Sequence, residues 1–150
     1  MSLQQWLKNT WLKPHQTTPE EIGKLWAMVD RNLADAASDT ISLDSQYNLA
    51  YRAALILCTI LLQAEGYVSG KGQGSHIRPI NALPLILGEA HRKNADYLDG
   101  CRGMRNRLEY EYVGAITSDD VAALLEYAHE LRTTVLAWLK EKHPELAPPE

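Results

Sequence analysis

The chain has little cysteine and no residue spacing typical of a metal site. Its 150 residues include two cysteines, Cys58 and Cys101, which lie far apart in apolar helical patterns and form no CxxC motif. The five histidines show neither HExxH spacing nor paired Cys/His spacing, so the sequence predicts no metal and no cofactor. We expect both cysteines to be buried free thiols.

Long apolar segments, a secretory signal and net positive charge are also missing. The longest apolar run, Ala53–Leu62, is far shorter than the roughly 20 residues that span a bilayer. Residues 1–15 lack the apolar core of a signal peptide, so we expect a cytoplasmic protein without membrane contact. The net charge of −4 argues against a generally basic protein that coats nucleic acid. Any nucleic-acid contact therefore has to use a local basic patch.

The length and composition predict one domain with its own core. A chain of 150 residues lies within the usual range of roughly 100–200 for one domain, and it shows no internal repeat and no low-complexity segment. Its 45% hydrophobic and 23% charged residues are ordinary for a globular protein. We predict a single helical domain over residues 1–150, with a core from 18 to 142 and a frayed tail from 145 to 150.

Apolar residues recur at helical spacing in four long segments. The predicted helices cover residues 18–36, 42–65, 89–113 and 117–142. The middle of the second, AALILCTILL, is apolar on nearly every face, which is typical of a helix surrounded by others. Shorter segments predict a short N-terminal helix over 3–11 and a short additional helix over 79–87, and no segment shows strand-period alternation. The expected fold is all-α, an up-and-down four-helix bundle.

Two connecting regions carry residues of interest. Trp6 and Trp11 share one side of the predicted N-terminal helix, and we expect them to pack on the domain itself, with docking on a partner as the alternative. The glycine-rich segment 67–76, YVSGKGQGSH, is predicted to be a surface loop. It lacks the GxxxxGK[ST] motif and no strand is predicted before it, which argues against a phosphate-binding P-loop. Lys71 and His76 remain candidate contributors to a nearby site.

Residues 101–112, CRGMRNRLEYEY, concentrate the candidate functional side chains. Over residues 91–107, five basic side chains stand against two acidic ones, which gives a local charge of +3 on an acidic chain. Three arginines, an asparagine and two tyrosines fall within the twelve residues. The segment is therefore the local basic patch that nucleic-acid contact would require.

Helical spacing places Arg105 near the apolar face of its helix. It precedes Leu108 by three residues and Tyr112 by seven, so it lies on or beside the core stripe. An arginine there needs a partner or a cleft, because an unpaired buried charge costs several kcal/mol. Spacing alone leaves open that Arg105 pairs with Glu109, or with an acid of another helix, and that Tyr112 is simply a core residue.

The octapeptide Arg105–Tyr112, RNRLEYEY, resembles the signature segment of the HEPN superfamily (higher eukaryotes and prokaryotes nucleotide-binding domains). That signature is an arginine, commonly followed by asparagine, and then, after a short spacer, a histidine that often precedes a tyrosine. The family fold is an up-and-down helical bundle with the motif before the final helix, and the predicted layout of residues 18–142 is similar. The segment 48–55, NLAYRAAL, resembles the second helix of bacterial members.

The resemblance implies roles for single residues. Arg105 matches the motif arginine, which in active members helps to hold and polarise the scissile phosphate, and Asn106 matches the adjacent polar residue. Tyr112 matches the trailing tyrosine, which a partner nucleotidyltransferase modifies in toxin–antitoxin pairs. The histidine position falls on Tyr110. A tyrosine pKa of about 10, against about 6.5 for histidine, suits base binding or stacking better than proton transfer near neutral pH.

Three functions are compatible with these patterns. The first is a HEPN-like protein that binds RNA or nucleotides, as a homodimer and as part of a toxin–antitoxin or defence system, with weak or absent ribonuclease activity. Its candidate catalytic residues are Arg105, Asn106 and Tyr110, and its candidate RNA- or nucleotide-binding residues are Arg102, Arg105, Arg107 and Tyr112. The alternative is a non-catalytic protein–protein interaction module that docks a partner through its tryptophans and basic helix. A small-molecule-binding bundle is the third reading, for which the sequence offers no specific pocket.

Overall fold

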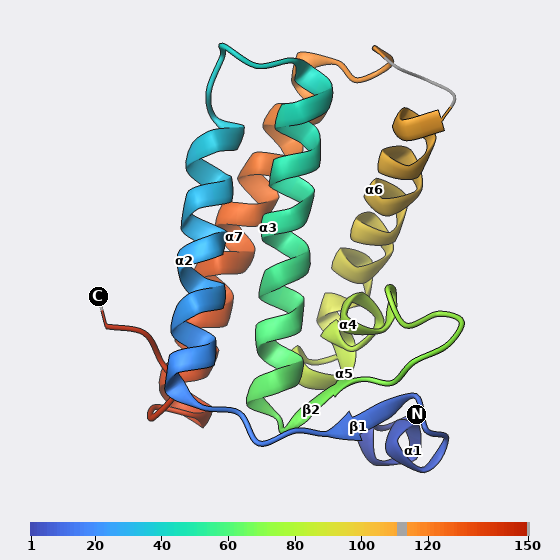
Figure 1. Cartoon of the computed structure of the whole chain (residues 1–150), viewed down its shortest axis with the longest axis vertical. Coiled ribbons are helices and arrows are strands. Elements are labelled where there is room, and N and C mark those ends of the chain that lie inside the picture. The colour runs from blue at the N-terminus through green and yellow to red at the C-terminus, as the bar shows by residue number, and fades with distance from the viewer. Residues whose placement is uncertain (111–113, 150) are drawn as a thin grey trace.

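The structure, a computed structural model, describes residues 1–110 and 114–149, and of residues 108–110 the backbone alone. Four long helices make up most of it: α2 (Pro19–Ala36), α3 (Leu43–Ala64), α6 (Arg92–Tyr110) and α7 (Ser118–Lys142). The chain runs up α2, down α3, up α6 and down α7 (Figure 1). The prediction of a mostly helical, all-α class is confirmed, apart from one small sheet.

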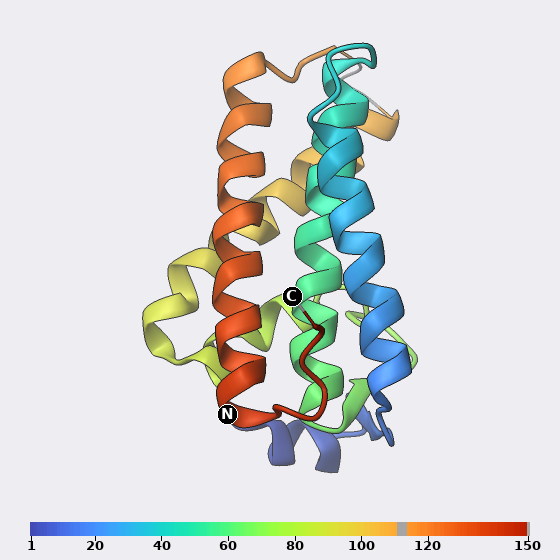
Figure 2. The same ribbon diagram turned by 90° about the vertical axis from the view of Figure 1, so that its left-hand side faces the viewer.

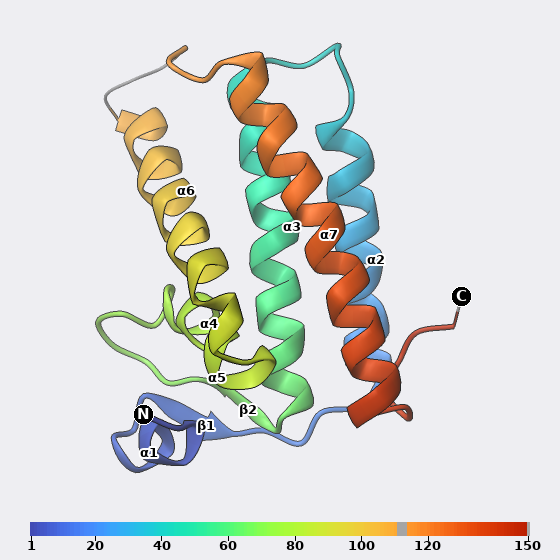
Figure 3. The ribbon, with the colours of Figure 1, turned by 180° about the vertical axis from the view of Figure 1, so that it is seen from behind.

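The helix α3 occupies the centre of the arrangement. It packs against α2 and α7 on one side, and α6 approaches it from the other. Figure 2, seen from the side of α2 and α7, shows these two helices in front and α6 behind. Figure 3 shows the same arrangement from behind, with α6 beside α3. The two short helices α4 (Arg78–Asn81) and α5 (Leu83–Leu87) support the first turns of α6.

Local sequence explains where the long helices begin. The hydroxyls of Thr18, Ser42 and Thr117 accept hydrogen bonds from the backbone N–H groups three residues further on, at 3.2, 3.1 and 3.1 Å. Each of these bonds satisfies one backbone donor that the first turn of a helix leaves without a partner. The three predicted helix starts are therefore confirmed to within a residue or two.

The apolar middle of α3 forms the core. Leu57, Ile60 and Leu61 are fully or almost fully buried, and both Cys58 and Cys101 are free and buried, as predicted. Within the described residues, α3 is the one helix long and apolar enough, by length and composition, to cross a membrane. Of its most apolar window, 61% is buried inside the protein. This burial is typical of the central helix of a globular core.

The N-terminal segment differs from the predicted helix over 3–11. The helix α1 (Leu3–Lys8) ends earlier, and strand β1 (Leu12–Pro14) follows it. This strand pairs antiparallel with β2 (Tyr67–Ser69), so the prediction that no strand precedes the glycine-rich loop was wrong. Strands of three residues are too short to show a period-two pattern, which is why the sequence did not reveal them.

A small second core holds this segment on the domain. Trp6 is buried against Leu12, Leu62 and Ala82, so its predicted packing on the chain itself is confirmed. Trp11 lies edge-on to Trp6 with ring centres 6.1 Å apart, and it remains 36% exposed. The second core therefore fixes the N-terminal segment beside the loop that follows β2.

The region before α6 also differs in detail from prediction. Instead of one short helix over 79–87, α4 and α5 are separate and meet at Ala82. Gly88 then adopts a φ of +110°, which a residue with a side chain rarely adopts, and a 3-10 turn over Glu89–His91 leads into α6. The helix α6 consequently begins three residues later than expected.

Candidate functional site

A cavity of about 270 Å³ lies between α3, α6 and the loop that precedes α4. We call it the arginine cavity, after the residues that line it: Tyr51, Leu55, His76, Arg102, Arg105 and Asn106. It brings together three of the predicted site residues of α6 and one of the two candidates from the glycine-rich loop. These side chains come from segments that are far apart in sequence.

Contacts with α3 orient Arg105. Its Nε donates a hydrogen bond of 2.7 Å to Asn48 Oδ1. Its guanidinium carbon lies 5.8 Å from the centre of the Tyr51 ring, within the roughly 6 Å range of a cation–π contact. Asn48 and Tyr51 stand one helical turn apart on α3, so they lie on the same face. The side chain of Glu109 is outside the described part of the chain, so its alternative pairing with Arg105 stays a prediction.

Arg102 carries a second guanidinium into the arginine cavity. Its Nε and Nη2 lie 3.1 and 3.0 Å from Asp99 Oδ1, and both side chains are partly exposed, at 34% and 47%. An ion pair with this degree of exposure contributes at most about 1 kcal/mol to stability. Arg102 can therefore readily exchange Asp99 for an incoming anion. Asn106 is exposed beside Arg105 and adds an amide with donors and an acceptor. The wall formed by α6 therefore suits a negatively charged group with several oxygens.

Tyr51 forms an aromatic part of the wall on α3. It is 2% exposed, and burial raises the pKa of its phenol to about 12, although the charges of Arg102 and Arg105 act in the opposite direction. The phenol is therefore protonated at neutral pH. Tyr51 is thus a buried wall residue whose ring contacts the Arg105 guanidinium, and it is a poor proton acceptor.

The other predicted site residues lie elsewhere or outside the described part of the chain. Arg107 is exposed on α6 and Lys71 is exposed in the loop, and neither belongs to the lining described for the arginine cavity. Tyr110 is the last residue of α6, and its side chain is outside the described residues. Tyr112 lies wholly outside them. The contributions assigned to the two tyrosines from the sequence therefore stay predictions.

Sequence reasoning did not select Asn48, Tyr51 or Leu55 as site residues. The signal was present, since these positions recur at three- and four-residue spacing within the segment 48–55 that carries the family resemblance. Such spacing puts them on one face of α3. A polar residue, Asn48, and an aromatic one, Tyr51, therefore share one face of α3 within the segment that carries the family resemblance.

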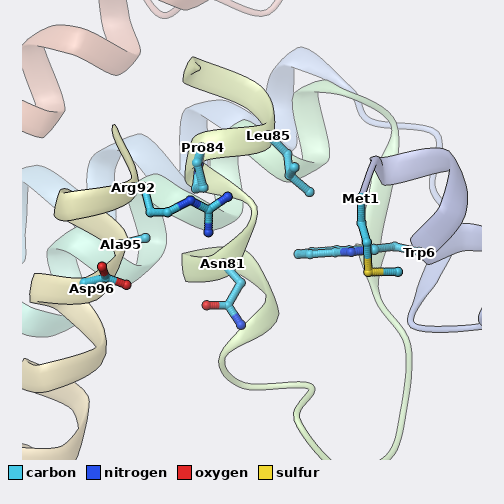
Figure 4. Close-up of a pocket in the computed structure, with 8 residues that line it drawn as sticks. All are labelled: Met1, Trp6, Asn81, Pro84, Leu85, Arg92, Ala95 and Asp96. Carbon is cyan, nitrogen blue, oxygen red and sulfur yellow. The ribbon is translucent and has the colours of Figure 1, made fainter. Parts of the chain in front are cut away.

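A second cavity, of about 350 Å³, lies between α1 and the start of α6. Figure 4 shows Arg92 and Asp96 on one side of it and Trp6 with Met1 on the other. Arg92 is paired with Glu89, so its charge is already largely compensated. This cavity contains none of the residues of the family motif, and we do not take it as the candidate site.

The described residues contain no group of three histidine, cysteine, aspartate or glutamate side chains that could hold a metal ion. Comparisons of the chain with protein-family models, with curated proteins and with solved structures find no match. The described lining of the arginine cavity contains two guanidinium groups, an amide and an imidazole, with the buried ring of Tyr51 behind Arg105. This set of groups is suited to an anion with several oxygens.

Proposed function

We propose that this chain binds single-stranded RNA or nucleotides through the arginine cavity, as a HEPN-like protein. The observation that carries this proposal is the presence of Arg102, Arg105 and Asn106 in one cavity with the ring of Tyr51. Guanidinium groups bind phosphate oxygens through charge-assisted, often paired hydrogen bonds. Exposed amides such as that of Asn106 are groups that proteins use to read the edges of unpaired bases, and the buried Tyr51 ring supports Arg105 beside it.

The order of the elements supports the HEPN resemblance. The described part of the motif segment, residues 105–110, lies on α6, the long helix before the final helix α7, and the chain alternates in direction through the four long helices (Figure 1). The segment 48–55 on α3 contributes two residues to the lining of the arginine cavity. On this basis we propose a HEPN-type four-helix bundle for the single domain over 1–150. We also propose that the protein is cytoplasmic, as the sequence predicts.

The proposal includes partners that the resemblance implies. We propose a homodimer in which two copies of α6 approach each other, so that both arginine cavities open into one cleft for RNA. Arg107, exposed on α6, would then contact the RNA backbone. A nucleotidyltransferase-like partner would modify Tyr112 within a toxin–antitoxin or defence system. Light scattering of the purified protein tests the dimer by its mass.

Binding of a fluorescently labelled single-stranded RNA tests the proposal. We expect Arg102→Ala and Arg105→Ala each to weaken binding about tenfold or more, because a hydrogen bond to a charged group contributes about 1.5–3 kcal/mol and each 1.4 kcal/mol is tenfold. Arg31→Ala is the matched control, because Arg31 is exposed on α2, away from the arginine cavity. Thermal unfolding of each variant separates lost contacts from lost folding.

Two outcomes contradict the proposal. If wild type and all three variants bind RNA equally, the arginine cavity is not the RNA site. If wild type shows no RNA binding and Arg105→Ala lowers only the melting temperature, Arg105 is a structural residue. The alternative function, a non-catalytic protein–protein interaction module, is then preferred, and exposed Trp11 is the first surface residue to test for it.

A further inference from the structure

A histidine from outside the motif stands at the arginine cavity. His76 is exposed in the loop between β2 and α4, and it lines the same cavity as Arg102 and Arg105. The resemblance places the family histidine at Tyr110, on α6. The chain therefore supplies an imidazole at this cavity from a different element.

Contacts with the N-terminal segment fix the path of this loop. At its start, the backbone N–H of Gly70 donates to the carbonyl oxygen of Trp11 at 2.7 Å. At its end, Arg78 donates from Nη1 to the same carbonyl oxygen at 3.0 Å, and from Nη2 to the carbonyl oxygen of Gln73 at 3.0 Å. The guanidinium carbon of Arg78 also lies 5.3 Å from the centre of the Trp11 ring. Both ends of the loop are thus tied to one residue, and His76 lies between these two contacts in the sequence.

Among the described residues that line the arginine cavity, His76 is the one good proton acceptor near neutral pH. Guanidinium groups stay protonated, an amide does not titrate, and the buried phenol of Tyr51 has a raised pKa. An imidazole ordinarily titrates near pH 6.5, which makes histidine the usual residue for proton transfer at neutral pH. Its place beside two phosphate-binding groups puts an acid–base group where a phosphodiester would lie.

We infer that His76 is the proton-transfer residue of the arginine cavity, and that it promotes attack of an RNA 2′-hydroxyl on the adjacent phosphodiester. This inference rests on the RNA binding proposed above. Neutral His76 accepts the proton of the 2′-hydroxyl, the 2′-oxygen forms a bond to phosphorus, and the bond from phosphorus to the 5′-oxygen breaks. Water supplies a proton to the 5′-oxygen, and the imidazolium of His76 returns its proton to solvent. The products are a 2′,3′-cyclic phosphate and a 5′-hydroxyl end.

The two arginines complete the reaction scheme. Arg102 and Arg105 hold the non-bridging oxygens of the phosphate and stabilise the negative charge that grows on them as the 2′-oxygen attacks. Arg78 touches neither phosphate nor 2′-hydroxyl in this scheme. It is a positioning residue, because it acts through the loop that carries His76.

Cleavage and binding of one single-stranded RNA, measured side by side, test the inference. We expect wild type to cut the RNA to cyclic-phosphate and 5′-hydroxyl ends, and not to cut the same sequence as DNA. His76→Ala should lower the cleavage rate about 100-fold or more, the usual contribution of a general base, and keep its RNA affinity. His129→Ala, at an exposed position of α7, is the matched control and should cleave like wild type. Imidazole added to the buffer should restore cleavage to His76→Ala and not to Arg105→Ala.

Each other outcome has a defined meaning. If wild type binds RNA without cutting it, the inference is overturned and the proposed RNA binding stands. Equal cleavage by wild type and His76→Ala also overturns it, as does an equal loss of binding and cleavage in His76→Ala, which would make His76 a binding residue. If wild type does not bind RNA at all, the proposed function fails first and the inference fails with it.

Discussion

Arg105 of α6 and Asn48 of α3 are joined by a hydrogen bond of 2.7 Å from Nε to Oδ1, although 57 positions separate them in the sequence. The bond and the nearby ring of Tyr51 set the direction of the guanidinium at the arginine cavity. A cation that is already oriented loses less conformational freedom when an anion binds. This link between two helices is a packing contact, and under the proposed function it also orients Arg105 for an anion.

A double-mutant cycle on Asn48 and Arg105 measures this link. We expect Asn48→Ala and Arg105→Ala to show a coupling energy of about 1–2 kcal/mol in urea unfolding, because the bond is partly buried and its donor is charged. The control cycle pairs Asn48→Ala with Arg31→Ala, which should be additive within about 0.5 kcal/mol. A coupling energy of zero for the first pair would mean that Asn48 does not orient Arg105.

Gly70 is predicted to be required for the close approach of the loop to the N-terminal segment. A Cβ at this position would overlap the carbonyl oxygen of Thr10 and lie 3.1 Å from that of Trp11. Both neighbours are backbone atoms, so Gly70→Ala should destabilise the protein by about 1–3 kcal/mol. Gly23→Ala is the matched control, since nothing lies within 4 Å of an added Cβ there. Because Gly23 is inside α2, its replacement should stabilise by about 0.5–1 kcal/mol, and thermal unfolding measures both.

Equal stability of Gly70→Ala and wild type would contradict this account. The loop would then be able to move away from Thr10 without loss, and the position of His76 would not depend on the contact. Hydrogen exchange over residues 70–77 would show whether such a shift takes place.

Arg78→Ala tests whether the loop positions His76. The substitution removes both hydrogen bonds and the contact with Trp11, so hydrogen exchange of the loop should become faster. RNA cleavage should fall, while RNA affinity should be retained, because the proposed function assigns it to Arg102 and Arg105. Unchanged cleavage together with faster exchange would show that the loop does not need to be fixed.

The sequence predicted what depends on local pattern. The central place of α3 followed from a segment that is apolar on nearly every face, and the helix starts followed from hydroxyl residues such as Thr18 and Ser42. That His76 and Arg105 line one cavity could not be predicted. The loop that carries His76 is joined to the N-terminal segment by the pairing of β1 with β2 and by the bond from Arg78 to Trp11, which joins residues 67 positions apart. Such non-local contacts leave no periodic signal in a single sequence.

The buried tyrosines predict a loss of stability at alkaline pH. Burial raises the pKa of Tyr51 to about 12 and raises those of Tyr47, Tyr97 and Tyr127 as well. The unfolded chain releases these phenol protons from about pH 10 upward, whereas the folded chain keeps them. Stability should therefore be unaffected by these groups below about pH 10 and should fall as the pH rises from there toward 12.

Urea unfolding at a series of pH values measures this effect. Tyr51 alone should account for a loss of about 1–3 kcal/mol over that range, since each unit of pKa shift corresponds to about 1.4 kcal/mol. In Tyr51→Phe, part of the alkaline loss should disappear. If wild type and Tyr51→Phe lose stability equally between pH 9 and pH 12, the burial of this phenol does not control its ionisation.

The most direct test of the central claim is the salt dependence of RNA binding by wild type, Arg102→Ala and the double variant Arg102→Ala/Arg105→Ala. The logarithm of the binding constant falls with the logarithm of salt concentration by about 0.7 for each phosphate of a single strand that the protein neutralises. If both arginines of the cavity contact phosphates, the slope should become less steep by about 0.7 in the single variant and by about 1.4 in the double variant. Arg31→Ala should keep the wild-type slope. Parallel lines for all four proteins would contradict the claim that the arginine cavity is where this chain holds RNA.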